Sequence, residues 1–175
     1  MAIKKSNKLV PDNDICIKGS VQLSSDKSLS IRSVLFASIA YGISHIKINN
    51  PGEDALTSIM AIKKLGIKVT QSDNQYTIYG LGIGYPSLKK RLLINCRNSG
   101  TTLRLLTPLI AGSKVNAKII GDHSLSKRPY RLEFLKEFLM NVKPTKKKFL
   151  PLMINGHTSC VKAEIKINKP SAQMV

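Results

Sequence analysis

The chain has 175 residues, a hydrophobic content of 42% and a formal net charge of +18 at pH 7. These values fit one ordinary globular domain with a core. Apolar runs long enough to cross a membrane, about 18 residues or more, do not occur, and the basic segment 1–9 lacks the apolar centre of a signal peptide.

The first predicted unit covers residues 23–80 and begins with the end of a strand at 21–24. Its apolar residues recur at helical spacing in two stretches and alternate in others. Glu53 and Asp54 favour a helix start because carboxylates stabilise the first turn of a helix. The expected elements, in order, are a helix at 29–40, a strand at 44–49, a helix from 53 to 66, and a hairpin of strands 68–70 and 76–79.

The second predicted unit covers residues 91–156 and repeats this order. A helix is expected to begin at Pro129, whose missing N–H costs nothing there, with Leu132, Leu135 and Leu139 on its apolar face. The other expected elements are a strand at 92–95, a helix at 99–111, and strands at 118–120, 142–145 and 152–155.

A third unit is expected from residue 161, with a strand at 164–168 and a helix start at Ser171. The pattern therefore repeats with a period of about 70 residues, which is typical of stacked supersecondary units. The sequence predicts an α/β (α+β) protein built from β-α-β-α-β-β repeats.

Two predicted helix starts carry the residue types that bind anions. The first is Asp26-Lys27-Ser28 followed by Arg32, and the second is Asn98-Ser99-Gly100-Thr101-Thr102 followed by Arg104. Unpaired N–H groups and the helix dipole both favour negative charge at such an end. Arg32 and Arg104 are 72 positions apart, which indicates one unit used twice around one anionic ligand.

A third motif precedes the helix expected after Pro129. It comprises Gly121-Asp122, Ser124-Leu125 and Lys127-Arg128-Pro129. An arginine held against a proline is a fixed fork for a carboxylate or a phosphate. Arg128 is therefore a candidate anion ligand, although a solvated surface position also fits it.

The positive charge has two interpretations. Clustered lysines and arginines neutralise phosphates in nucleic-acid-binding modules. The alternative is codon bias together with an anionic small-molecule substrate, because the chain holds 22 Lys, 20 Ile and 11 Asn but only 6 Arg. Aromatic residues, which stack on bases, make up 5% of the chain. We favour the second interpretation and keep a nucleic-acid-binding module as the alternative.

Cys16, Cys96 and Cys160 are widely spaced and odd in number. This usage fits reduced cytosolic thiols better than a disulfide framework. The three histidines are isolated and have no cysteine or carboxylate at ligand spacing, which argues against bound zinc. We expect a cytoplasmic protein without a metal site.

Taken in series, these motifs resemble the family of 5-enolpyruvylshikimate-3-phosphate (EPSP) synthases over nearly the whole chain. The matching pieces are Asp26-Lys27-Ser28 with Arg32, Asn98 to Thr102 with Arg104, the motif of 121–129, and Ser171-Ala172-Gln173. Departures from the family pattern are Ser25, Ile31 and Tyr130. The sibling UDP-N-acetylglucosamine enolpyruvyl transferase, a second alternative, carries a reactive cysteine in the loop region where this chain has none.

The resemblance implies transfer of the enolpyruvyl group of phosphoenolpyruvate to the 5-hydroxyl of shikimate 3-phosphate, with loss of phosphate and without metal or organic cofactor. This reaction belongs to the shikimate pathway of chorismate and aromatic amino acid biosynthesis. By the same resemblance, shikimate 3-phosphate would contact Lys27, Ser28, Arg32, Ser171, Ala172 and Gln173. Phosphoenolpyruvate would contact Lys27, Asn98, Gly100, Thr101, Arg128 and Gln173. Lys27 would be the catalytic residue present in this chain.

The resemblance also implies an inverse α/β barrel of two globular halves, each made of three such units, in a cytoplasmic protein that is a monomer when complete. A complete member is more than twice this long, and its second half supplies the acid/base carboxylates. We therefore expect residues 1–22 to cross to the missing half and residues 23–175 to form a partial N-terminal domain. Alone, the chain is not expected to catalyse the transfer.

Overall fold

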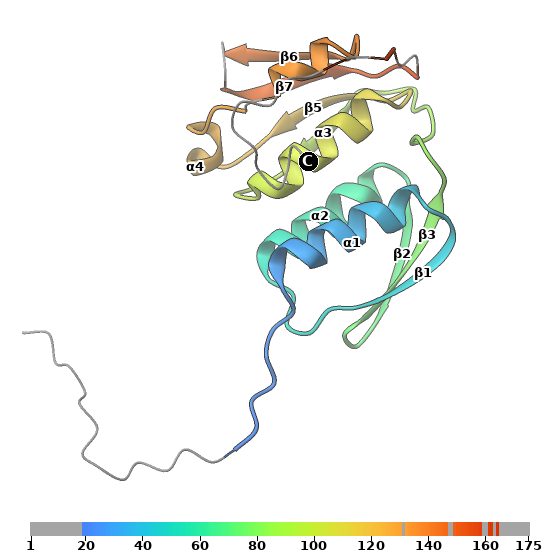
Figure 1. The fold of residues 1–175 in the computed structure, drawn as a ribbon, viewed down its shortest axis with the longest axis vertical. Helices are drawn as coiled ribbons and strands as arrows, with labels where there is room; N and C mark the ends of the chain where they lie inside the picture. Colours follow the sequence, from blue (N-terminus) through green and yellow to red (C-terminus); the bar gives the residue numbers. More distant parts are fainter. Residues whose placement is uncertain (1–18, 131, 147–148, 159–160, 163, 165–175) are drawn as a thin grey trace, which may run out of the picture.

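The structure is a computed structural model that describes residues 19–130, 132–146, 149–158, 161–162 and 164. It contains four α-helices and one 3₁₀-helix within these residues (Figure 1). The helices are α1 Lys27–Ile39, α2 Glu53–Lys64, α3 Gly100–Ala111, α4 His123–Ser126 and the 3₁₀-helix η1 Glu133–Lys136. The strands are β1 Tyr41–Lys47, β2 Lys68–Ser72, β3 Gln75–Leu81, β4 Leu92–Asn95, β5 Asn116–Ile120, β6 Asn141–Lys146 and β7 Phe149–Asn155.

The strands form two sheets, one from each half of the described chain. The first has the order β1-β3-β2 and is antiparallel throughout, with Tyr41 opposite Leu81. The second has the order β4-β5-β7-β6, in which β4 and β5 are parallel and the other pairs antiparallel. The parallel pair is connected through α3, as a parallel pair requires a crossover.

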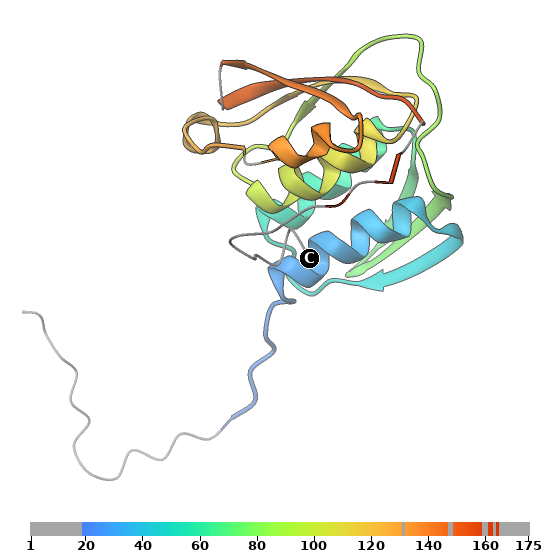
Figure 2. The ribbon, with the colours of Figure 1, turned by 45° about the horizontal axis from the view of Figure 1, so that its top comes forward.

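Helices α1, α2 and α3 lie between the two sheets, so the sheets are on the outside (Figures 1 and 2). Helices α1 and α2 pack on the first sheet, α3 packs on the second, and the three helices contact one another. The buried side chains of this helical layer include Ile31, Leu35, Ile62, Leu106 and Ile110, none of which has exposed surface. Apolar burial at this shared layer is the main force holding the two units together.

The three long helices begin where capping chemistry is available. The Asp26 carboxylate accepts the Leu29 N–H at 2.7 Å before α1. Helix α2 carries two carboxylates in its first turn and two lysines in its last, which complements the helix dipole. Ser99 precedes α3, and its hydroxyl accepts the Thr102 N–H. These helices and the β2–β3 hairpin confirm the elements that periodicity predicted.

The segment between the two units also joins their helices. Tyr85, which lies in this connection, is buried; its hydroxyl is 2.9 Å from the Ser38 hydroxyl at the end of α1. Its N–H donates to the Ser113 hydroxyl beyond α3, also at 2.9 Å. Burial raises the pKa of Tyr85 to about 12, partly offset by the Ser38 hydrogen bond. The phenol therefore stays neutral, and Tyr85 connects the end of α1, through its hydroxyl, with the residues after α3, through its backbone N–H.

The strand expected at 21–24 is wrong, because these residues have no regular structure. Val21 and Leu23 are exposed over most of their surface. The contact with the sheet region comes one residue later, where the Ser25 N–H donates to the Asn49 carbonyl at 3.0 Å and the Asn49 N–H donates to the Ser25 hydroxyl. This pair of bonds fixes the entry to α1 without a strand ladder.

The helix expected to begin at Pro129 is also wrong. Residue 122 caps a short turn earlier, α4, and only η1 follows the proline. Leu139 has a φ of 57° and is exposed, while the Met140 N–H closes back on the Leu135 carbonyl at 3.1 Å. The chain therefore turns at Leu139 into β6, much as a left-handed residue ends a helix. Of the third unit's strand, expected at 164–168, only Glu164 is described, and it has no regular structure; residues 165–168 and the helix start at Ser171 lie outside the described residues.

Candidate functional site

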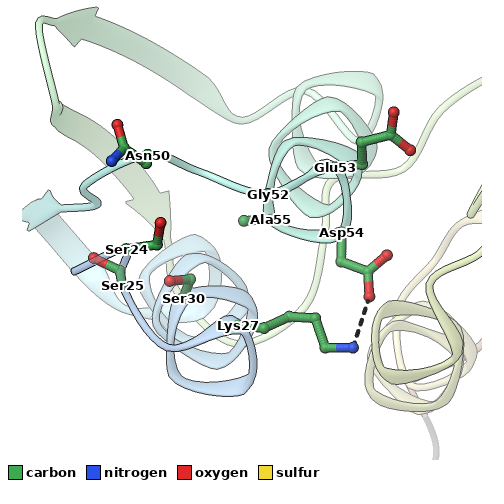
Figure 3. A pocket seen from close by; sticks show the side chains of 9 residues that line it. All are labelled: Ser24, Ser25, Lys27, Ser30, Asn50, Gly52, Glu53, Asp54 and Ala55. Carbon is green, nitrogen blue, oxygen red and sulfur yellow. Dashed lines mark ion pairs between the residues drawn. The ribbon is translucent and has the colours of Figure 1, made fainter. Parts of the chain in front are cut away.

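The two anion-binding motifs lie at the same end of the molecule. Helices α1 and α3 both begin on the left in Figure 1, and the turned view in Figure 2 agrees. The first turn of α2 lies beside the first turn of α1 (Figure 3). The partial positive charges of neighbouring helix N-termini therefore add at this end, which favours an anionic ligand.

Lys27, Ser28 and Arg32 follow one another around the first turns of α1. The Lys27 ammonium lies 3.4 Å from the Asp54 carboxylate at the start of α2, and the Lys27 side chain is 67% exposed (Figure 3). The Arg32 Nε donates to the Ser28 hydroxyl at 3.3 Å. Sequence reasoning did not place Asp54 here; its position in the first turn of a neighbouring helix was the available signal.

A cavity of about 410 Å³ lies between the first turns of α1 and α2 (Figure 3). Its lining includes Ser24, Ser25 and Ser30 together with Glu53, Asp54 and Lys27. The Glu53 carboxylate points away from the serines and from Lys27, whereas the Asp54 carboxylate is paired with the Lys27 ammonium (Figure 3). This pairing makes the side of Lys27 that faces Asp54 unsuited to an anion. An anionic ligand would therefore reach Lys27 from its solvent side, away from Asp54.

Of the hydroxyl groups at the start of α3, two are buried and hydrogen-bonded within the protein and one is accessible. Ser99 and Thr102 are fully buried and their hydroxyls are 2.7 Å apart. Ser99, one residue after Asn98, is the N-cap. The hydroxyl of Thr102 is therefore satisfied within the protein, while Asn98 and the half-buried Thr101 stay accessible. Arg97 precedes them with a φ of 47°, an uncommon conformation for a residue other than glycine.

The Arg128 side chain reaches back to this helix start. Its Nη2 donates to Oδ1 of the Asn98 side chain at 2.7 Å and to the Ser124 hydroxyl at 2.9 Å. A Cβ placed on Gly100 would lie 3.6 Å from Nη1 of Arg104 and 3.9 Å from Nη1 of Arg128. Two guanidinium groups and Cδ1 of Leu125, which would lie 3.8 Å from that Cβ, thus surround the one position of this turn that has no side chain. The missing side chain leaves the two guanidinium groups accessible from this position.

The residues before Arg128 form its support. The Asp122 carboxylate accepts the Leu125 N–H at 2.7 Å, and the Asp122 N–H donates to the Arg97 carbonyl at 2.8 Å. Leu125 is buried, and a Cβ on Gly121 would come within 2.7 Å of its Cδ2. Gly121 and Asp122 therefore fix the α4 turn against the β-sheet region. This structural role explains their presence in the motif without any contact to a ligand.

The structure groups the predicted residues into two neighbourhoods, the start of α1 and the start of α3. Ser171, Ala172 and Gln173, predicted to close around the substrates, lie outside the described residues. Within the described part of the chain, no group of three or more histidines, cysteines or carboxylates could hold a metal ion. No helix among the same residues is long and apolar enough to cross a membrane.

Comparisons with known proteins place the chain in one family. The family described as EPSP synthase (3-phosphoshikimate 1-carboxyvinyltransferase) matches residues 13–175. A 3-phosphoshikimate 1-carboxyvinyltransferase from Streptococcus pyogenes serotype M49 is 37% identical over 144 residues, which cover 81% of this chain and 34% of that protein. The same identity is found with the protein of serotype M3, of which 33% is covered. The chain therefore spans about a third of the length of these curated relatives.

The fold agrees with this assignment. An EPSP synthase from Acinetobacter baumannii superimposes with a TM-score of 0.80 at 30% identity, covering 89% of this chain and 36% of that one. A second structure of the enzyme from that organism gives the same values. The helices-inside arrangement of Figure 1 is thus the EPSP synthase fold, as the resemblance predicted.

Proposed function

The chain belongs to the EPSP synthase family, and we propose that it forms part of an enzyme that transfers the enolpyruvyl group of phosphoenolpyruvate to the 5-hydroxyl of shikimate 3-phosphate. The product would lead to chorismate and the aromatic amino acids. The observation that carries the proposal is the pair of guanidinium groups of Arg104 and Arg128 beside Gly100. This pair lies at the same end of the molecule as the Lys27 motif.

In this proposal the start of α1 binds shikimate 3-phosphate. Lys27 and Ser28 offer an ammonium and a hydroxyl on the first turn of α1, and Arg32 offers a guanidinium one turn later. A phosphate dianion accepts hydrogen bonds from all three groups, and charge-assisted bonds to it are about twice as strong as neutral ones. Lys27 also lies on the side from which the second substrate would approach, so it would contact both.

The start of α3 binds phosphoenolpyruvate. Arg128 supplies a guanidinium to the phosphate or carboxylate of this substrate, Gly100 leaves the space, and Asn98 and Thr101 border it. Both substrates are highly anionic, so a fixed cationic end offsets their mutual repulsion and brings them into reaction distance.

Proton transfer is a separate requirement. The reaction needs a proton on the methylene carbon of phosphoenolpyruvate and removal of the hydroxyl proton. At this end of the molecule, Asp26 and Asp122 cap helices and Asp54 pairs with Lys27. The Glu53 carboxylate points away from Lys27 (Figure 3). We propose that the acid/base carboxylates come from residues outside these 175, and that the chain alone releases no phosphate from the two substrates.

The remaining expectations belong to the same proposal. We propose that Ser171, Ala172 and Gln173 complete the substrate contacts and that residues 1–22 cross to a second half. Residues 23–175 would form the partial domain whose repeats cover about 23–80 and 91–156, with a third from 161. The complete enzyme would be a cytoplasmic monomer that needs no metal or organic cofactor.

Titration calorimetry with phosphoenolpyruvate tests the proposal on the wild-type chain and on Arg128→Ala. Arg91→Ala is the matched control, since it removes the same charge at a position just before β4, where the Arg91 guanidinium donates to the Asn155 side chain. We expect Arg128→Ala to weaken binding at least tenfold and the control to change it less than twofold. Equal affinities of all three proteins would contradict the proposal.

Oligonucleotide binding is measured on the same proteins over a range of salt concentrations. Micromolar affinity for nucleic acid that falls steeply with salt, without any response to the two substrates, would favour the nucleic-acid-binding alternative. Binding of UDP-N-acetylglucosamine in preference to shikimate 3-phosphate would favour the sibling transferase. We expect neither result.

A further inference from the structure

Among the described residues, the Arg128 guanidinium is held through one of its three nitrogens. Nη2 donates to Oδ1 of Asn98 at 2.7 Å and to Oγ of Ser124 at 2.9 Å. A terminal guanidinium nitrogen carries two hydrogens, so these two acceptors use both of them. Because the group is planar, fixing Nη2 also fixes the direction of Nη1, which lies beside Gly100.

Ser124 is itself fixed by the short turn that carries it. Asp122 caps this turn, and the buried Leu125 anchors it. Ser124 and Arg128 are four residues apart, and the Arg128 N–H donates to the Leu125 carbonyl at 3.1 Å. The hydroxyl therefore occupies a defined place from which it can orient the arginine.

Orientation matters because an exposed arginine has many rotamers, most of which it loses on binding an anion. A tether that restricts the side chain beforehand lowers that loss. The Asn98 contact crosses from the turn before α3 and the Ser124 contact comes from α4, so the two acceptors hold Nη2 from two elements.

We propose that Ser124 is a positioning residue for Arg128. Its hydroxyl and Oδ1 of the Asn98 side chain hold Nη2, so that Nη1 is directed to the position beside Gly100, where it binds the phosphate or carboxylate of an anionic substrate. The identity of that substrate, phosphoenolpyruvate, rests on the proposed function; the tether does not.

The test compares Ser124→Thr with Ser124→Val, two side chains of one shape that differ in the hydroxyl. Ser126→Ala is the control, because Ser126 is on the same turn and its hydroxyl points to the Gly121 carbonyl. Arginine labelled with ¹³C and ¹⁵N reports rotation of the Arg128 guanidinium about its Cζ–Nε bond by NMR, with the signal assigned from Arg128→Lys.

We expect rotation at least fivefold faster in Ser124→Val than in the wild type, and wild-type rates in Ser124→Thr and Ser126→Ala. The dissociation constant for phosphoenolpyruvate should rise about fivefold in Ser124→Val, which corresponds to roughly 1 kcal/mol. It should change less than twofold in the other two variants. A general loss of structure would affect Thr and Val alike, so the pair separates positioning from folding.

Equal rotation rates in Ser124→Val and the wild type would overturn the proposal, as would equal changes in the Thr and Val variants. If rotation responds as expected but the wild type binds neither phosphoenolpyruvate nor inorganic phosphate, the tether is supported and the proposed function fails. The two inferences therefore have distinguishable outcomes.

Discussion

Replacing Gly100 by alanine should separate the stability of the protein from its affinity for phosphoenolpyruvate. Gly100 is the first residue of α3, and a Cβ there would meet Nη1 of Arg104 at 3.6 Å, Cδ1 of Leu125 at 3.8 Å and Nη1 of Arg128 at 3.9 Å, which are ordinary contact distances. Nothing in the fold therefore opposes the methyl group. Two of the three atoms that it approaches belong to the guanidinium groups of Arg104 and Arg128, beside which we place the ligand.

The two expected effects have opposite signs. Alanine at a position that it can adopt without strain stabilises by about 0.4–1 kcal/mol, chiefly by restricting the unfolded chain. At a helix start we expect the lower end of that range, or a rise in melting temperature of roughly 1–2 °C. Binding should weaken, because the new methyl group would occupy the same volume as a ligand oxygen that is hydrogen-bonded to both guanidinium groups. We expect at least a tenfold loss, about 1.4 kcal/mol.

Calorimetric titration and a thermal melt on the same Gly100→Ala sample measure both effects. The control is Gly52→Ala, at the N-cap of α2, where a Cβ would meet nothing within 4 Å. Unchanged affinity for phosphoenolpyruvate in Gly100→Ala would refute the placement of the anion between the two arginines. A melting temperature lower by several degrees would refute the local geometry.

Three further predictions follow from other contacts. Asp122→Ala removes the cap of α4 and should cost about 1 kcal/mol of unfolding free energy by chemical denaturation; no change would mean that the cap is not formed. Asp54→Asn should strengthen inorganic phosphate binding a few-fold, because it removes a negative charge beside Lys27. It should alter the unfolding free energy by less than about 1 kcal/mol, since the Lys27 side chain of the pair is 67% exposed and the Asp54 side chain 22%; weaker phosphate binding would contradict the prediction. Burial raises the pKa of Tyr85 and the pKa of Cys96 each to about 12. In the unfolded chain these two side chains lose their protons from about pH 9 to 10, whereas in the folded protein they stay neutral. The unfolding free energy should therefore fall between pH 9 and 12, and the fall should be shallower in Tyr85→Phe. A flat profile would show that these groups are not buried.

Periodicity was sufficient to predict the elements whose buried face follows directly from their own apolar pattern. Helix α1 was expected at 29–40 and is Lys27–Ile39, and the β2–β3 hairpin was located by its turn. Both have apolar residues that point into one shared layer, so local pattern and burial agree. The strand at 21–24 and the helix after Pro129 were wrong because their ends depend on other segments: Ser25 bonds Asn49, and Leu139 turns the chain toward β6.

The candidate site shows the same division. Its residue types could be predicted, because helix starts rich in hydroxyls and cations favour anions whatever surrounds them. The contacts between elements could not be predicted. Arg128 meets Asn98 across 30 residues, and Lys27 meets the first turn of α2. Such pairings follow from how the helices pack, for which the sequence pattern has no signal.

The central claim is that the shared end of α1 and α3 binds the anionic substrates of EPSP synthases. Titration calorimetry with shikimate 3-phosphate, on the wild-type chain, Arg32→Ala and the charge-matched Arg91→Ala, tests it most directly. We expect binding by the wild type and Arg91→Ala with dissociation constants within twofold of each other, and at least tenfold weaker binding by Arg32→Ala. Binding that is the same in all three proteins, or that is weakened equally by both substitutions, would contradict the claim.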